Sequence, residues 1–283
     1  MKITVLLENS RVNPELSCAH GLSLLAEWDD NCVLIDTGPE RHFIDNAVFL
    51  GKELSKVQSL IISHGHRDHG GGLEHFLQLN GEARVYLHKD AFENHWAIKP
   101  DGGLKSVSLD DSLPEKYPGR VEYVDKFREL GDILIFTCDS NVGKSPEMNE
   151  NLLKGQPPEK DDFGHEINVL INDGAGKVLF VGCAHRGIIN ILHSCREITG
   201  TYPELVVGGF HLSSKGLGKA ESEASVRQLA YELKAAGCTY ITGHCTGETA
   251  AVVLKEVLGE KLFLMSSGIS FCFDEAGDIY ENK

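Results

Sequence analysis

The stretch His64-Gly65-His66-Arg67-Asp68-His69 places three imidazoles and one carboxylate within six residues. An apolar run rich in branched side chains precedes it at residues 57–63, and this run predicts a buried strand. Glycines follow at residues 70–72, before a helical pattern begins at Leu73. A loop that leaves a strand can aim several side chains at one point, and imidazole with carboxylate suits zinc, iron or manganese. A chance histidine-rich surface run is the alternative, which the flanking strand and glycines disfavour.

Length and composition narrow the class of protein. The chain has 283 residues, 41% of them hydrophobic, and a formal net charge of -15. We expect a single domain over residues 1–283 and a small-molecule substrate. Nucleic acid and anionic membranes are disfavoured as partners because both need a basic face. The N-terminus reads as a strand and no apolar run approaches the ~20 residues of a membrane span, so a cytoplasmic location is expected. The oligomeric state stays open.

Strand and helix patterns both occur throughout the chain. Strand-like runs are expected at residues 3–7, 24–28, 32–35, 59–62, 84–87, 133–138, 167–171, 178–181, 205–207, 240–241 and 271–273. Helical patterns fall at residues 43–50, 73–79, 188–198, 221–236 and 249–258. Two packed sheets with helices outside would accommodate this order. Two irregular segments, residues 99–123 and 139–164, are expected to be long loop excursions, which either shape a binding pocket or are solvated linkers.

Four further strands end in a polar residue. Asp36 follows a strand and precedes Thr-Gly, where it is either a turn residue or a carboxylate that orients a metal-bound histidine. His185, His211 and His244 each come just after a short apolar strand, beside glycine. One such histidine would more often be structural. Three of them, in a chain that also holds the cluster at residues 64–69, predict a site at one edge of the sheets, where parallel strand ends converge.

The eight cysteines show no C-x-x-C pair, which disfavours a zinc ribbon or a thioredoxin-type site. Most are expected to be reduced thiols of the core. Cys183 and Cys245 differ from the others because each lies close to one of the strand-end histidines.

The H-x-H-x-D-H motif, with Asp36 before it and strand-end histidines after it, resembles the metallo-β-lactamase superfamily over nearly the whole chain. The turns around Cys183, His211 and His244 resemble a branch described as dihydropterin ribofuranosylaminobenzene-phosphate synthase-like. The resemblance implies an α/β fold, an αββα sandwich of two mixed sheets with helices outside. It also implies one or two divalent metal ions per chain, with zinc the first choice and iron or manganese the alternatives.

The resemblance also assigns site residues. It gives His64, His66 and His185 to a first metal, and Asp68, His69 and His244 to a second, with Asp36 behind them. Many members of the superfamily carry a bridging Asp where this chain has Cys183. Three alternatives follow: Cys183 is a soft ligand, His185 reaches the metal from the same turn, or water alone forms the bridge. We favour His185 as the ligand and Cys183 as a bystander.

The remaining histidines are given weaker roles. His211 is expected near the metals, as an extra ligand, a proton donor or an anion contact. His165 would be a ligand only in a pattern that lacks His185. Surface or satisfied buried positions are expected for His20, His42, His75, His88, His95 and His193.

The function expected from these residues is that of a metal-dependent hydrolase. Metal-bound hydroxide would attack a small phosphate- or carbonyl-containing substrate, with Asp68 and His211 as the catalytic residues. A pterin-linked synthase of the branch named above is the alternative within the same site. A di-iron oxidoreductase is disfavoured because such members carry Glu at the position of His66. A non-enzymatic metal-binding module is disfavoured by Asp68 and by ligands for two sites.

Overall fold

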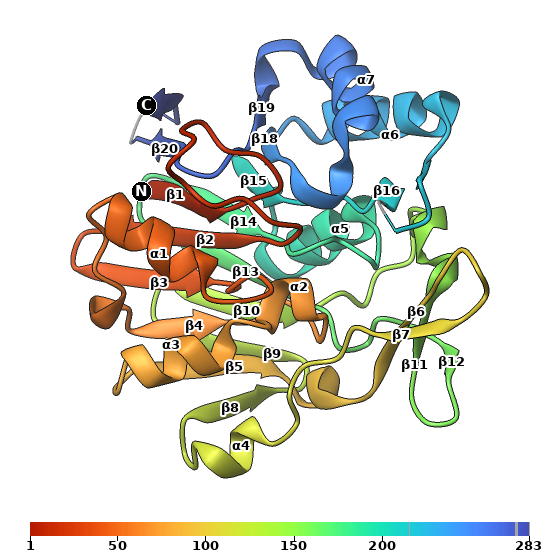
Figure 1. The fold of residues 1–283 in the computed structure, drawn as a ribbon. Coiled ribbons are helices and arrows are strands. Elements are labelled where there is room, and N and C mark those ends of the chain that lie inside the picture. The colour runs from red at the N-terminus through yellow and green to blue at the C-terminus, as the bar shows by residue number, and fades with distance from the viewer. Residues whose placement is uncertain (215, 275–276, 283) are drawn as a thin grey trace.

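The computed structural model describes residues 1–214, 216–274 and 277–282, and two large sheets dominate it (Figure 1). The first sheet has the strand order β21 (Ile279–Asn282), β20 (Ser270–Phe273), β1 (Lys2–Leu7), β2 (Ser23–Trp28), β3 (Asn31–Ile35), β4 (Ser59–Ile61), β5 (Arg84–His88) and β8 (Val121–Val124). The last four of these strands pair in parallel, and the others are antiparallel.

The second sheet repeats this combination of parallel and antiparallel strands. Its order is β19 (Leu262–Leu264), β18 (Thr239–Thr242), β15 (Leu205–Gly208), β14 (Lys177–Phe180), β13 (Ile167–Asn172), β10 (Ile133–Thr137) and β9 (Phe127–Leu130). In this sheet β14, β15, β18 and β19 run parallel, and a helix connects each of them to the next.

Three apolar layers hold the fold together. The central layer is formed by side chains from the facing sides of the two sheets. On the outer side of the first sheet, α1 (His42–Phe49), α3 (Leu73–Leu79) and α4 (Leu113–Lys116) contribute to a second layer. On the outer side of the second sheet, the third layer includes α5 (Ile188–Thr199), α6 (Glu223–Ala236) and α7 (Glu248–Leu258). The predicted αββα sandwich of two mixed sheets is therefore confirmed.

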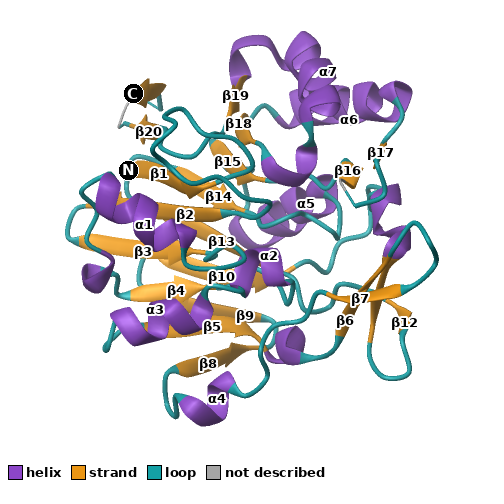
Figure 2. Ribbon diagram, viewed as in Figure 1, coloured by secondary structure: helices purple, strands orange, loops and turns teal. Residues whose placement is uncertain are grey.

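The two segments expected to be irregular supply three of the four strands of a third, small sheet. Its strands are β12 (Glu159–Lys160), β11 (Leu152–Lys154), β6 (His95–Ile98) and β7 (Leu104–Ser106), and it projects from one side of the sandwich (Figure 2). This sheet could not be predicted from the sequence because its strands are short and lack an alternating apolar pattern. β6 directly precedes the first segment and pairs with β7 of that segment and with β11 of the second, so it joins two segments that were expected to be separate loops.

The other elements are short. They are the strand pair β16 (Ser213–Ser214) and β17 (Lys219–Ala220), the helix α2 (Arg67–Gly70), and the 3₁₀ turns η1 (Leu54–Lys56), η2 (Lys89–Phe92), η3 (Glu147–Asn151), η4 (His244–Thr246) and η5 (Gly259–Lys261). Among the described residues, no helix has the length and apolar character needed to cross a membrane.

Candidate metal centre

The carboxyl ends of five parallel strands bring the predicted site residues together. Asp36 follows β3 and the motif at residues 64–69 follows β4, whereas the turns after β14, β15 and β18 supply His185, His211 and His244. The first two strands belong to one sheet and the other three to the other sheet. All five predicted histidine ligands are buried, and the side chain of Asp68 is 24% exposed. The site therefore lies at one edge of the sandwich, between the two sheets.

Three of these histidines form a compact triangle. The ring centroids of His64, His66 and His185 are 4.6, 4.9 and 5.0 Å apart, and the rings stand at 74° to 85° to one another. The Nε2 atom of each ring is buried and has no hydrogen-bond partner. Burial, with the neighbouring imidazoles, holds the pKa of all three well below the usual value, so the rings are neutral. Three neutral imidazoles with unpartnered nitrogens are a ligand set suited to a divalent metal.

Hydrogen bonds fix which nitrogen of His185 and His64 carries the hydrogen. Asn149 donates its Nδ2 to the carbonyl of His185 at 2.8 Å, so its Oδ1 faces the ring and accepts from Nδ1 at 2.8 Å. Ser63 donates its hydroxyl to Asp36, so its oxygen accepts from Nδ1 of His64 at 2.9 Å. Because both Nδ1 atoms are donors, both Nε2 atoms present a lone pair.

The second group contains His69, His244 and Asp68. Asp36 accepts from Nδ1 of His69 at 2.6 Å, and Oδ1 of Asn9 lies 3.2 Å from Nδ1 of His244. The two Nε2 atoms face each other at 3.1 Å, and Oδ2 of Asp68 lies 3.4 Å from Nε2 of His244. Two ring nitrogens this close need a proton or a cation beside them. Burial opposes a charged ring, but the carboxylates of Asp36 and Asp68 raise the pKa of His69 to about 9.

Cys183 lies between the two groups. Its Sγ is 3.1 Å from Nε2 of His69, and it is within 4.8 Å of ligand atoms of His64 and His185 on one side and of His244 on the other. Burial raises the pKa of the Cys183 thiol well above its usual value, so a thiolate here needs a cation beside it. Cys183 thus lies within reach of both groups of predicted ligands.

Buried carboxylates hold the turns that carry the ligands. Asp36 accepts the backbone N–H of Ser63, Glu166 accepts those of His185 and Arg186, and Glu8 accepts that of His244 at 2.6 Å. Burial raises the pKa of Glu166 to about 7, although the two N–H donors oppose the rise. Each ligand-bearing turn is thus anchored through its backbone by a carboxylate from a neighbouring segment.

The backbone is strained at the same edge. Six residues other than glycine have positive φ among those described, and five of them line the site: Asp36, Phe163, Ala184, His211 and His244. Positive φ costs about 1 kcal/mol or more for such residues and persists where the surroundings enforce it. Gly182 meets a different constraint, because a Cβ there would lie 2.7 Å from Cβ of Ser63. The ends of β4 and β14 can approach so closely only because this residue is glycine.

Comparison with known proteins agrees with this arrangement. A family model described as the metallo-beta-lactamase superfamily matches residues 18–141. A solved structure described as a metal-dependent hydrolase of the beta-lactamase superfamily is 30% identical, with a TM-score of 0.79, and the match covers 95% of this chain and 98% of that one. This chain belongs to the metallo-β-lactamase superfamily. It is an enzyme of that superfamily, whose members generally bind divalent metals.

Two curated relatives come from Methanocaldococcus jannaschii. One is 7,8-dihydropterin-6-methyl-4-(beta-D-ribofuranosyl)-aminobenzene-5'-phosphate synthase, which is 29% identical over 288 residues, 95% of each chain. The other is an uncharacterized protein, 25% identical over 264 residues, covering 90% of this chain and 94% of that one. The resemblance to the dihydropterin synthase-like branch of the superfamily is thus confirmed as similarity along nearly the whole chain.

The metallo-β-lactamase site extends beyond the residues that the motifs identified. His20, for which a surface or satisfied buried position was expected, has Nε2 at 3.4 Å from Oδ2 of Asp68, with its side chain 46% exposed. His95 and His165 lie buried beside His66, with Asp161 between them. Local sequence gave little indication of these residues. The one feature they share in the sequence is their residue type, histidine or acid. Only the fold brings their segments to the site.

His211 lies beside the predicted first group, as expected from its strand-end position. Its ring centroid is 4.1 Å from that of His185, and both of its ring nitrogens are buried without a partner. Its backbone N–H donates to Sγ of Cys245 at 3.2 Å. The ring of His211 therefore lies against that of the predicted ligand His185.

Two asparagines make matching contacts on opposite sides of the site. Asn149 bonds both the carbonyl and Nδ1 of His185, and Asn9 bonds the same two groups of His244. Asn149→Ala is expected to weaken one bound ion by about 10- to 100-fold, the usual effect of losing a partner that orients a metal ligand, and Asn9→Ala to weaken the other. Chelator competition measures both constants, and each variant serves as the other's control. If both variants bind as the unchanged protein does, the asparagines do not orient the ligands.

Proposed function

We propose that this enzyme is a metal-dependent hydrolase with a binuclear site, zinc being the first choice of metal. One ion would be held by His64, His66 and His185, and the other by Asp68, His69 and His244. The observation that carries the proposal is the fixed hydrogen position on the histidines. Protein acceptors take the Nδ1–H of His64, His69, His185 and His244, which leaves each Nε2 to a cation.

The residues around the metals supply the rest of the chemistry. Divalent ions bound here would lower the pKa of a water molecule and polarise a carbonyl or phosphoryl oxygen. His69 and His244 outweigh the effect of burial and hold the pKa of Asp68 well below its usual value. The carboxylate of Asp68 is therefore charged and can orient a water molecule by accepting a hydrogen bond. In the proposed reaction it would also take up a proton. His211 would donate a proton to the leaving group or stabilise negative charge on the substrate.

A synthase reaction is the second candidate, and the name of the first curated relative favours it. The same ligands and the same proton-transfer residues would then serve bond formation instead of hydrolysis. The substrate in both cases would be a small molecule that carries a phosphate or a carbonyl group. The net negative charge of this chain supports neither nucleic acid nor an anionic membrane as a partner.

A substrate panel tests the hydrolase proposal. Zinc-loaded protein is incubated separately with aryl phosphodiesters, phosphomonoesters, lactones and thioesters, and the products are identified by mass spectrometry. We expect turnover of at least one class, abolished when a chelator removes the metal and restored when zinc is added back. Protein that contains its metals but turns over none of the four classes would contradict the hydrolase proposal. Condensation of a pterin with a phosphorylated aminobenzene riboside would favour the synthase.

Replacement of His211 separates catalysis from metal binding. We expect His211→Ala to lower kcat by about 10²- to 10⁴-fold, the usual contribution of a positioned proton donor, with metal content unchanged. Steady-state kinetics with parallel metal analysis measure the two effects. If the variant loses metal in proportion to activity, His211 is a ligand and not a proton donor.

A further inference from the structure

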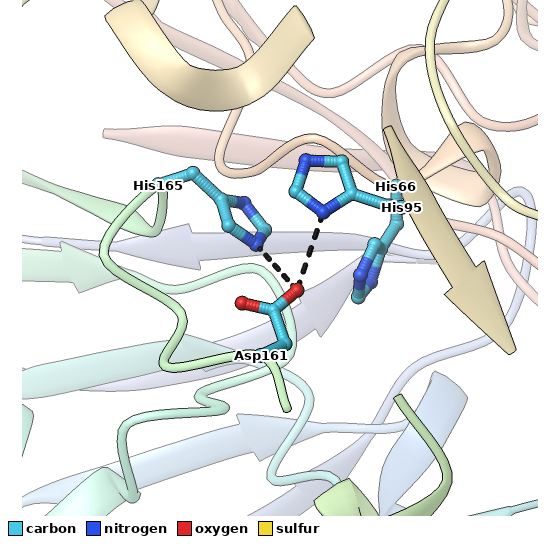
Figure 3. A group of neighbouring side chains, drawn as sticks. All are labelled: His66, His95, Asp161 and His165. Atoms are coloured by element: carbon cyan, nitrogen blue, oxygen red, sulfur yellow. Dashed lines mark hydrogen bonds and ion pairs between the residues drawn. The ribbon is translucent and has the colours of Figure 1, made fainter. Parts of the chain in front are cut away.

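A second group of histidines lies against the proposed first metal position. His66, His95, Asp161 and His165 are all buried, and each offers a possible ligand atom within 4.8 Å of the others (Figure 3). His95 is the first residue of β6, and Asp161 directly follows β12, so both belong to the small sheet or its edge. His66 belongs to the motif at residues 64–69. The group therefore connects the small sheet to the loop that carries the metal ligands.

The hydrogen bonds of the group have a definite direction. Gly65 donates its backbone N–H to Nδ1 of His165 at 3.0 Å. Because Nδ1 accepts that N–H, the ring hydrogen of His165 lies on Nε2. That atom lies 3.2 Å from Oδ2 of Asp161, to which it donates. Nδ1 of His95 lies 3.2 Å from the same oxygen, and Figure 3 shows the two interactions meeting there.

These directions disfavour a third metal in the group. A metal on Nε2 of His165 would move the ring hydrogen to Nδ1, where it would oppose the N–H of Gly65. Nε2 of His165 and Nδ1 of His95 both lie 3.2 Å from Oδ2 of Asp161. Asp161 is thus the shared acceptor for two ring N–H groups, and its other oxygen accepts the backbone N–H of Phe163 at 2.8 Å.

We propose that Asp161 is a positioning residue for the first metal, acting through His165 on the backbone of Gly65. Gly65 lies between the two ligands His64 and His66, so its orientation sets theirs. The backbone of Gly65 is closely packed, because a Cβ on this residue would lie 2.5 Å from Nε2 of His95. The inference rests on the proposed function in one respect: His64 and His66 must hold a metal.

Three variants test the chain of contacts. In Asp161→Asn an amide N–H would face the N–H groups of His165 and His95, so His165 is expected to lose its fixed hydrogen position. His165→Leu removes the acceptor for Gly65, whereas the carbonyl oxygen of His165→Asn can replace Nδ1 as that acceptor. Asp162→Asn is the matched control, because that exposed side chain pairs with Lys154, which lies outside the group.

The measurement is the affinity of the two ions, obtained by chelator competition on zinc-loaded full-length protein, with circular dichroism to confirm folding. We expect Asp161→Asn and His165→Leu to weaken one ion by about 10- to 100-fold and to leave the other within a few-fold. His165→Asn should recover most of the loss, and Asp162→Asn should behave as the unchanged protein. Nitrogen NMR of the unchanged protein should show the hydrogen of His165 on Nε2, a readout that does not depend on any variant folding.

The outcomes separate the two proposals. If the unchanged protein binds no metal, the proposed function fails. If the unchanged protein binds two ions and Asp161→Asn binds both equally well, the positioning role of Asp161 is wrong. Three ions in the unchanged protein, with one lost in Asp161→Asn, would make the group a metal site and overturn the inference. A hydrogen on Nδ1 of His165 would also overturn it.

Discussion

His64→Ala is expected to abolish measurable turnover, with a loss of about 10³-fold or more. Its Nε2 belongs to the triangle with His66 and His185, and Ser63 fixes its ring, so the loss of this side chain opens the first metal position. Metal ions contribute several kcal/mol to the stabilisation of a charged transition state, which corresponds to a loss of this size. The measurement is kcat/KM on whichever substrate class the panel identifies.

His75→Ala is the matched control for this prediction. His75 is an exposed histidine on α3, and its replacement should leave kcat/KM unchanged. A His64→Ala protein that is folded and fully active would show that the first metal position takes no part in the reaction.

Replacement of Cys183 is expected to affect both ions at once. Its sulfur lies between the two groups of ligands, so Cys183→Ala should weaken both ions by more than the 10- to 100-fold typical of a residue behind the ligands. Cys183→Asp should retain both ions, because carboxylate is a ligand for the same metals. Chelator competition measures the affinities, and cobalt substitution should give a sulfur-to-cobalt absorption band that both variants lose.

Cys245→Ala distinguishes the two neighbouring thiols. Sγ of Cys245 accepts the backbone N–H of His211, and we assign it no place among the ligands. Its removal should leave the cobalt band in place. A band that disappears in Cys245→Ala and persists in Cys183→Ala would show that Cys245 is the bound sulfur and that the bridge has been assigned to the wrong residue.

The sequence predicted the sandwich and the position of the site because both depend on local patterns. The helical spacing at residues 221–236 predicts α6, and the structure places the helix at Glu223–Ala236 with Ser222 as its N-cap. The motif at residues 64–69 follows a recognisable strand, and so do His185 and His244. Parallel strand ends converge by geometry, so the strand assignments alone brought these histidines to one edge.

Contacts between distant segments could not be predicted in the same way. Asn9 and Asn149 are ordinary polar residues in the sequence, and only the fold places each against a ligand histidine. Cys183 was identified as an anomaly in the motif, but its place between the two groups depends on the closeness of β4 and β14, which Gly182 permits. Asp161 lay in a segment expected to be a loop. Its proposed positioning role depends on the small sheet, whose strands have no alternating apolar pattern in the sequence.

The claim central to this account is that ligands from both sheets form one binuclear site. The most direct test is the number of zinc ions per chain after reconstitution and dialysis, measured by elemental analysis on the unchanged protein, His64→Ala and His244→Ala. The account predicts two ions in the unchanged protein and one in each variant, because the variants remove ligands of different ions. No bound metal in the unchanged protein, or two ions in both variants, would contradict it.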